Sequence, residues 1–572
     1  RDQSGPDRAS CAPTRAAQGT KAAEYYRGQR VPERMEDVLN ALFPLPPADL
    51  YGELVANYFS KFSKAPVICK LVGRKVLDGV GQPTLEVEIY CTVKNYEKRI
   101  CSTVMATHSQ IPENALPETI EADAKERNDS VHTAVQWVNE ALNTMLRDLD
   151  PTDQCQADKM LGEYFANKIE EKKKIEKEEE EKKKAEEEAA KATHASPSCP
   201  SASPPKQKKG GKTGKKVSAE VNPIPPAEPA EPVLRGSLAI GGTSLAIAKA
   251  GATISRVPLY LHTALLKHNQ VQMTLPLPMV TVLNCEKKLP TKLKLVKEVM
   301  LIPPVELSLQ QVLCVNNVNI LFCFQPPPLK RISHLGCLTI GYDNLEQLLL
   351  QLQTACNNIG LELGIDMYLA INFAAHELMD YGKGKYEILT GTFKTPDEMV
   401  AMYVEMIDNF PFIIALIDPL RKEDRDQWSS ICCALGSKCY LIAEDAATQI
   451  SKLTTDQNIN IAMCSGVVLK YTNQTKVSDL IELTGVLHGE SRGKGSPDRE
   501  SSDESLVDLA VGLGARFLKL GGLSRGERVA KYNRLLAIEE ELAANGALRT
   551  SFFLTLFSAC HEYGHKDWRE ND

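Results

Sequence analysis

The chain has 572 residues, 43% of them hydrophobic, and a formal net charge of -7 at pH 7. These values predict a large globular protein, and the mild negative charge argues against nucleic acid or an anionic membrane as a partner. No apolar stretch approaches the roughly eighteen residues of a membrane-spanning helix and residues 1–30 contain no hydrophobic signal core, so we expect an intracellular, cytoplasmic protein without a membrane partner.

The first predicted unit is helical and spans residues 31–66, after a flexible tail at 1–30. Apolar residues recur at helical spacing in two short segments: Met35, Val38, Leu39 and Leu42 in the first, and Leu50, Leu54, Tyr58 and Phe62 in the second. Two such helices cannot bury both apolar faces alone, so we expect them to dimerise. The string PPADLYGELVANYFSKF is similar to the docking and dimerisation fold of regulatory subunits, which implies an anchoring-protein amphipathic helix as a partner at 31–62. A helical hairpin packed on the rest of the chain is the alternative.

The next segment alternates apolar and polar residues over 67–91, which predicts a β-hairpin with a Gly/Pro turn, and a helical stretch follows from His132 to Leu149. Residues 165–232 form a charged, low-complexity insertion. Its Glu/Lys alternation could support a solvated single helix through i,i+4 pairs, whereas the part KQKKGGKTGKK has no means of burying apolar area and is predicted to be disordered.

Strands and helices alternate from residue 234 to residue 549, which predicts a barrel of mainly parallel strands over 271–549 and a C-terminal tail at 550–572. The strand-like segments are TLPLPMVTVLN, VKEVMLIPP, GIDMYLAINFAA, PFIIALIDPL, KCYLIAEDA, INIAMCSGVVLK and LGARFLKLGG. In such a barrel, residues at the carboxyl ends of the strands build the site. The polar stretch HGESRGKGSPDRESSDES is predicted to be a solvated loop, in which Arg492, Lys494 or Arg499 could attract phosphate.

Two lysines at strand ends carry the most specific signal. Lys470 follows the apolar run Val467–Leu469, and Lys519 precedes GGLSRGERVAKYNRLLAIEEEL. These strings resemble the C-terminal part of enolases, and the resemblance covers roughly 67–164 and 234–549. It implies an α/β fold with an enolase-type barrel, an antiparallel opening and an N-terminal α+β cap at 67–164 and 233–270. It also implies conversion of 2-phosphoglycerate to phosphoenolpyruvate and water, a step of glycolysis.

The resemblance assigns roles to individual residues. Lys470 matches the general base, and its apolar strand could lower its pKa into a useful range, although a single lysine at a strand end is more commonly a solvated rim residue. Lys519 matches the second active-site lysine, and Glu298 matches the substrate-binding glutamate. Three further matches are weaker: His334 at or beside the acid position, Lys288 at the place of the family's histidine, and Ser109 at the mobile-lid serine.

The metal positions depart from the family pattern. Glu444 keeps a carboxylate, but Asn372 and Ile417 stand where the family has two acidic ligands. Because Mg²⁺ prefers charged oxygen ligands, weak or absent magnesium binding is expected. Asp418 is adjacent to Ile417, yet neighbouring strand residues point to opposite faces, so it is not expected to substitute.

Two functions stay open at this point. One is a phosphopyruvate hydratase of low activity, and the other is a catalytically weak or inactive, enolase-shaped scaffold attached through the N-terminal helices. A homodimer, or a heterodimer with a true enolase, is expected in either case. The resemblance is to a divergent, sperm-associated branch of the family, which implies the sperm flagellum as the location.

Overall fold

The computed structural model describes residues 15–44, 47–54, 64–106, 116–193, 226, 234–267, 273–285, 292–304, 331–339, 341–444, 464–471, 473–486, 491–495 and 501–546. The chain divides into two compact units. One comprises Arg1–Pro66 with Val93–Tyr96, and the other comprises Val67–Thr92 with Glu97–Asp572.

The described helices of the smaller unit are α1 (Arg15–Gly28), α2 (Val31–Leu42) and α3 (Leu50–Glu53). Helix α2 is the helix predicted after residue 31. Helix α3 begins at the N-cap Asp49, whose Oδ1 accepts a hydrogen bond from the backbone N–H of Gly52 at 2.8 Å. Tyr58 and Phe62, which the sequence places on the second helix, lie outside the described residues.

The larger unit begins with a three-stranded sheet of β1 (Val67–Leu77), β2 (Pro83–Val93) and β3 (Tyr96–Val104). Strands β1 and β2 form the predicted antiparallel hairpin. Helix α4 (Pro117–Trp137) continues through a π-helical turn (Val138–Leu142) into α5 (Asn143–Met145), so this helical stretch begins earlier than the predicted His132. Asn139 joins helix and sheet, because its amide both accepts from the N–H of Gly73 at 2.9 Å and donates to the carbonyl of Gly73 at 3.1 Å.

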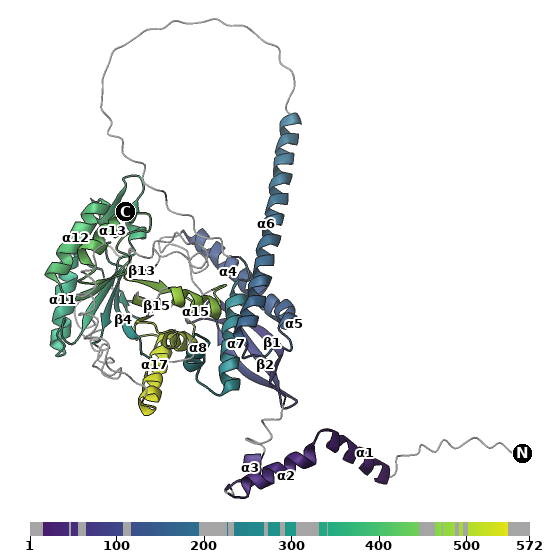
Figure 1. The fold of residues 1–572 in the computed structure, drawn as a ribbon. Helices are drawn as coiled ribbons and strands as arrows, with labels where there is room; N and C mark the ends of the chain where they lie inside the picture. Colours follow the sequence, from purple (N-terminus) through teal and green to yellow (C-terminus); the bar gives the residue numbers. More distant parts are fainter. Residues whose placement is uncertain are drawn as a thin grey trace, which may run out of the picture. The chain divides into compact units, whose positions relative to one another are not determined.

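Helix α6 (Gln154–Thr193) is 40 residues long and appears as one uninterrupted helix in Figure 1. Its first turns are anchored, since Gln154 and Asp158 are buried. Beyond them the helix carries Glu/Lys pairs, such as Lys172 with Glu176 at 3.6 Å. The predicted Glu/Lys helix is therefore confirmed as far as Thr193, and the boundary predicted at residue 165 falls inside a continuous helix.

The largest sheet has ten strands, and eight of them form the barrel. In ring order they are β4 (Leu277–Asn284), β5 (Glu298–Ile302), β8 (Tyr368–Asn372), β12 (Ile413–Ile417), β13 (Tyr440–Ala443), β14 (Gly466–Leu469), β15 (Ser491–Gly495) and β16 (Phe517–Gly521). Strand β5 is antiparallel to β4 and β8, and the other neighbours are parallel. Strand β16 pairs with β4, so the series returns to its first strand. This is the predicted enolase-type barrel with an antiparallel opening.

The interior of the barrel is apolar below the strand ends. Its core cluster includes Met279, Met300, Ile414, Ile442 and Phe517. Helices α11, α12 and α13 lie outside the strands in Figure 1. The barrel's helices are α11 (Leu345–Asn358), α12 (Pro396–Asn409), α13 (Arg425–Leu435), α15 (Val477–Val486), α16 (Ser505–Gly512) and α17 (Gly526–Ala544).

Two sequence expectations are wrong here. Residues Ser491–Gly495 form strand β15 between β14 and β16, where a solvated loop was expected. Helix α7 (Leu238–Ser255) has the length and hydropathy of a membrane-spanning helix, although no such stretch was expected. Of the residues of α7, 78% are buried inside the fold. The helix packs against α6 and α8 (Leu259–Lys267) as a core helix.

Candidate active site

Four charged side chains gather at one end of the barrel because each stands at or near the end of a strand. Glu298 opens the reversed strand β5, Glu444 follows β13, Lys470 follows β14, and Lys519 lies within β16. Parallel strands end at the same rim, and a reversed strand begins there. We call Glu298, Glu444, Lys470 and Lys519 the lysine–glutamate cluster.

The cluster is a chain of alternating charges. The Nζ of Lys519 lies 2.9 Å from Oε1 of Glu298 and 2.8 Å from Oε2 of Glu444, and the Nζ of Lys470 lies 3.1 Å from Oε1 of Glu444. The two glutamate side chains are 4% exposed, and those of Lys519 and Lys470 are 9% and 17% exposed. Burial alone would lower the pKa of Lys519, but the carboxylates of Glu298 and Glu444 outweigh it and hold that pKa well above its usual value.

Asn372, the last residue of β8, is fixed between the carboxylates. Its Oδ1 accepts the backbone N–H of Ala374 at 3.0 Å, which assigns the amide orientation. Its Nδ2 therefore faces Glu298 Oε1 at 3.0 Å and Glu444 Oε2 at 3.3 Å. Asn372 presents hydrogens to the centre of the site, and its oxygen is turned away.

The neighbouring position on β12 is apolar. Ile417 pairs in register with Asn372 on one side and with Ile442 on the other, and it belongs to the buried core cluster. The next residue, Asp418, leaves the strand with φ of 46° and accepts the backbone N–H of Glu444 at 2.7 Å. Asp418 thus positions the backbone of Glu444.

Comparison with known proteins decides the family. The description "Enolase, C-terminal TIM barrel domain" matches residues 336–554. Enolase 4 of Homo sapiens is 50% identical over 579 aligned positions, which cover 94% of this chain and 91% of the human protein. This chain belongs to the enolase family. Enolase 4 of Mus musculus is 49% identical, over 92% of this chain and 90% of the mouse protein, and enolase 4 of Xenopus laevis is 48% identical, over 92% of both chains.

The enolase superfamily uses Mg²⁺ to stabilise its enolate-like intermediate, but the residues at this rim do not fit that ion. Hard cations need several oxygen ligands. Here Glu444 directs its two oxygens to Lys470 and Lys519, Asn372 offers nitrogen, and Ile417 offers no ligand. Across the described part of the chain, no group of three or more His, Cys, Asp or Glu could hold a metal ion.

The loop that carries His334 is held against strand β16. His334 lies between the short strands β6 (Arg331–Ile332) and β7 (Leu338–Thr339). Gly522 donates its N–H to the carbonyl of Leu335 at 2.7 Å, and a Cβ on Gly522 would lie 2.2 Å from the carbonyl oxygen of Gly336. The glycine turn after Lys519 therefore permits this close approach, which brings the His334 loop to the strand of the second lysine.

Two other residues to which the sequence resemblance assigned a role, Lys288 and Ser109, lie outside the described residues. Of the three cations considered for phosphate binding, Arg492 and Lys494 stand on β15, and Arg499 lies outside the described residues.

Sequence reasoning missed Asn284 at the end of β4. It pairs in register with Glu298, so the two side chains share one face of the sheet. Asn284 is 1% exposed, and neither of its amide atoms has a hydrogen-bond partner. The available signal was its place at the carboxyl end of a barrel strand, next to the strand that carries Glu298.

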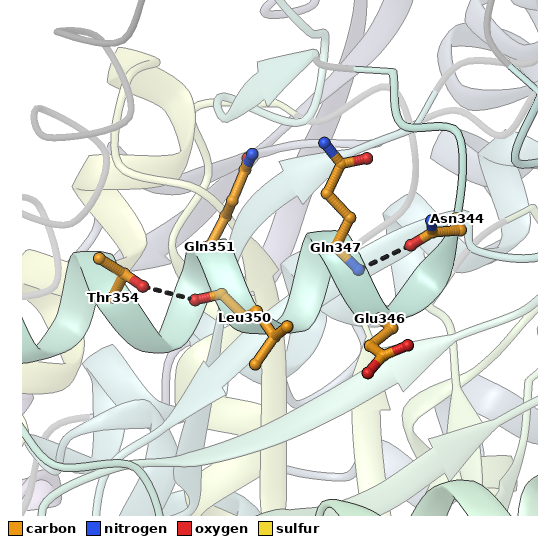
Figure 2. Close-up of a pocket in the computed structure, with 6 residues that line it drawn as sticks. All are labelled: Asn344, Glu346, Gln347, Leu350, Gln351 and Thr354. Carbon is orange, nitrogen blue, oxygen red and sulfur yellow. Dashed lines mark hydrogen bonds between the residues drawn. The ribbon is translucent and has the colours of Figure 1, made fainter.

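A surface depression on α11 contains none of the cluster residues (Figure 2). Its lining comes from one helix and its cap: Asn344, Glu346, Gln347, Leu350, Gln351 and Thr354. Asn344 caps the helix by accepting the N–H of Gln347 at 2.7 Å, and Thr354 donates to the carbonyl of Leu350 at 2.8 Å. These contacts serve the helix itself, so the rim of the barrel is the better candidate site.

Proposed function

We propose that this enolase-family protein binds 2-phosphoglycerate and phosphoenolpyruvate at the lysine–glutamate cluster and interconverts them as a slow phosphopyruvate hydratase. The single observation that carries the proposal is the placement of Lys470 and Lys519 on the two oxygens of Glu444, at 3.1 and 2.8 Å. Lysine ammonium groups at a barrel rim can donate hydrogen bonds to the oxygens of a small anionic ligand.

The reaction breaks the C2–H and C3–O bonds of 2-phosphoglycerate and forms a C2=C3 double bond and water. Lys470 is the proposed base that takes the C2 proton, and Lys519 is the proposed countercharge for the substrate carboxylate. His334 is the proposed donor that protonates the departing hydroxide, supported by the contact of its loop with β16.

Two features support a low rate. The Nζ of Lys470 is engaged in an ion pair with Glu444 at 3.1 Å, and that contact must reorganise before Lys470 can take the C2 proton. In addition, two acidic positions of the family are Asn372 and Ile417, and loss of one group that stabilises the transition state costs about a hundredfold or more in rate.

Phosphoenolpyruvate production by the purified full-length chain, freed of host enolase, tests the proposal. Turnover should be slow and should disappear in Lys470→Ala. Lys438→Ala is a matched control, because Lys438 is an exposed lysine outside the cluster that pairs with Asp408. Equal rates in wild type and Lys470→Ala would contradict the hydratase proposal.

A second proposed function is that of an enolase-shaped scaffold, attached through the N-terminal helices. Helix α2 supports it by leaving a row of apolar side chains exposed: Val31 by 37%, Met35 by 38% and Leu39 by 49%. These residues stand four apart and so share one face, suited to an amphipathic helix of an anchoring protein. We propose the cytoplasm of the sperm flagellum as the location, and a homodimer or a heterodimer with a true enolase as the assembly.

Binding of a labelled anchoring-type amphipathic helix tests the scaffold function. Leu39→Asp should abolish binding because it places a carboxylate in the apolar row. Asn40→Asp adds the same group one residue further round the helix and should leave binding intact. Equal binding by both variants would exclude the face of α2 as the docking site.

A further inference from the structure

We infer that the ammonium group of Lys519 takes the place of a divalent cation in this site, so that the site binds its anionic ligand without magnesium. The ligand part of this inference rests on the proposed function. The part about the cation stands on the cluster alone.

The first support is the position of Lys519 between two carboxylates from different strands. Glu298 comes from β5 and Glu444 follows β13, and the Nζ of Lys519 reaches them at 2.9 and 2.8 Å. A cation between two buried carboxylates attracts both and offsets part of their mutual repulsion. Lys519 supplies such a cation from within the chain.

The second support is the charge balance. Glu298 and Glu444 carry two negative charges, and Lys470 and Lys519 carry two positive charges, so the cluster is neutral as it stands. A divalent cation entering between the carboxylates would meet the ammonium of Lys519 at close range. In a buried site that repulsion is weakly screened, and displacing Lys519 would leave a buried charge without its partners.

The third support is the state of the remaining ligand positions. The oxygen of Asn372 is committed to the N–H of Ala374, and the amide nitrogen that faces the carboxylates cannot coordinate a hard cation. Ile417 contributes only apolar surface. The ends of β8 and β12 therefore offer a hydrogen-bond donor and an apolar surface, and neither side chain offers an oxygen to a cation.

The ammonium group of Lys519 keeps capacity for a ligand. A lysine ammonium has three hydrogens, and Lys519 directs two of them to Glu298 and Glu444. One hydrogen of Lys519 is left for a carboxylate or phosphate oxygen. An anion can therefore bind beside the neutral cluster without rearranging it.

Thermal unfolding of the full-length chain tests the cation part, with magnesium titrated against a chelator at matched ionic strength. The wild-type midpoint should not change. Lys519→Met removes the charge at similar length, so this variant should unfold at a lower temperature in chelator and recover part of the loss in magnesium. Saturable stabilisation of the wild type by magnesium, or a folded Lys519→Met that does not respond to magnesium, would overturn the inference. If Lys519→Met does not fold, the wild-type titration decides alone.

Calorimetric titration with phosphoenolpyruvate tests the ligand part. The dissociation constant should be the same in chelator and in magnesium. Binding that requires magnesium would overturn the inference. If phosphoenolpyruvate binds under neither condition, the proposed function fails, while the unfolding experiment still decides whether Lys519 replaces the cation.

Discussion

The two halves of the barrel rim have different chemistry. On the side of β13, β14 and β16, Lys470 and Lys519 each lie within ion-pair distance of Glu444, at 3.1 and 2.8 Å. On the side of β8 and β12, Asn372 and Ile417 carry no charge, and their side chains are used for a backbone hydrogen bond and for the apolar core. The difference teaches that carboxylates alone can hold two lysines at the rim, because Glu298 and Glu444 pair with Lys519 and Glu444 also pairs with Lys470.

The largest loss of folding stability is expected for Lys519→Met. It leaves Glu298 and Glu444 buried without their shared cation, and removing one partner of a buried ion pair costs about 3–5 kcal/mol. Urea unfolding of the variant should show that loss. Lys470→Met is the matched control, since Lys470 is more exposed and faces one of these carboxylates, and it should lose clearly less stability. Equal losses would mean that Lys519 has no special place in the cluster.

Acid should weaken the contacts that join the segment before α16 to helix α7 and strand β3. Asp503 precedes α16 and bonds Lys249 at 3.0 Å and the hydroxyl of Thr103 at 2.8 Å. Burial alone would raise the pKa of Asp503, but Lys249 and the hydrogen bonds from Ser505 and Thr103 lower it to about 2. Because the folded pKa is depressed, Asp503 contributes about 2 kcal/mol of stability above the pKa of the unfolded state, which is lost as pH falls from about 4 to 2.

Unfolding free energies across that pH range measure the effect. Asp503→Asn should be less stable than wild type near neutral pH, and the difference should shrink towards pH 2. A difference that stays constant with pH would show that Asp503 does not titrate in this window.

A smaller loss of folding stability is expected for a change at the end of β8. Asn372→Leu removes the donors to Glu298 and Glu444 and leaves the N–H of Ala374 without its acceptor, which should cost about 1–3 kcal/mol. The unfolding free energy in urea measures it. A neutral result would show that Asn372 does not support the lysine–glutamate cluster.

The smallest effect on stability is expected for Asn284→Leu, which matches Asn372→Leu in chemistry and in level on the barrel. The amide of Asn284 has no hydrogen-bond partner, so its replacement should be close to neutral or stabilising. A loss as large as that of Asn372→Leu would show that Asn284 supports the folded barrel through contacts of its own.

The barrel and the lysines could be predicted from sequence for a physical reason. Apolar strands of a barrel leave a strong local signal, and the glycine turn after Lys519 is required by the close approach of Gly336 to Gly522. Strand β15 could not be predicted in this way, because SRGKG contains no apolar residue and becomes a strand by pairing with β14 and β16.

The residue types at the site could be predicted from the sequence, but the orientation and pairing of their side chains could not. Sequence shows that carboxylates are missing at positions 372 and 417, but it does not show the orientation of the Asn372 amide, which the N–H of Ala374 sets. Nor does it show that Lys519 bridges Glu298 and Glu444, since these residues come from strands far apart in the chain. The unpartnered amide of Asn284 is likewise a property of packing.

Helix α6 gives the molecule a mechanical property. At 1.5 Å per residue, its 40 residues extend for about 60 Å. The anchored end is tied to the fold by Gln154, which donates to the carbonyl of Ser244 at 3.1 Å, and by Asp158, which accepts the N–H of Ser478 at 2.9 Å. A load applied near Thr193 therefore acts through a long lever arm on a few buried hydrogen bonds, and torque on this rod is delivered to the junction of α6, α7 and α15.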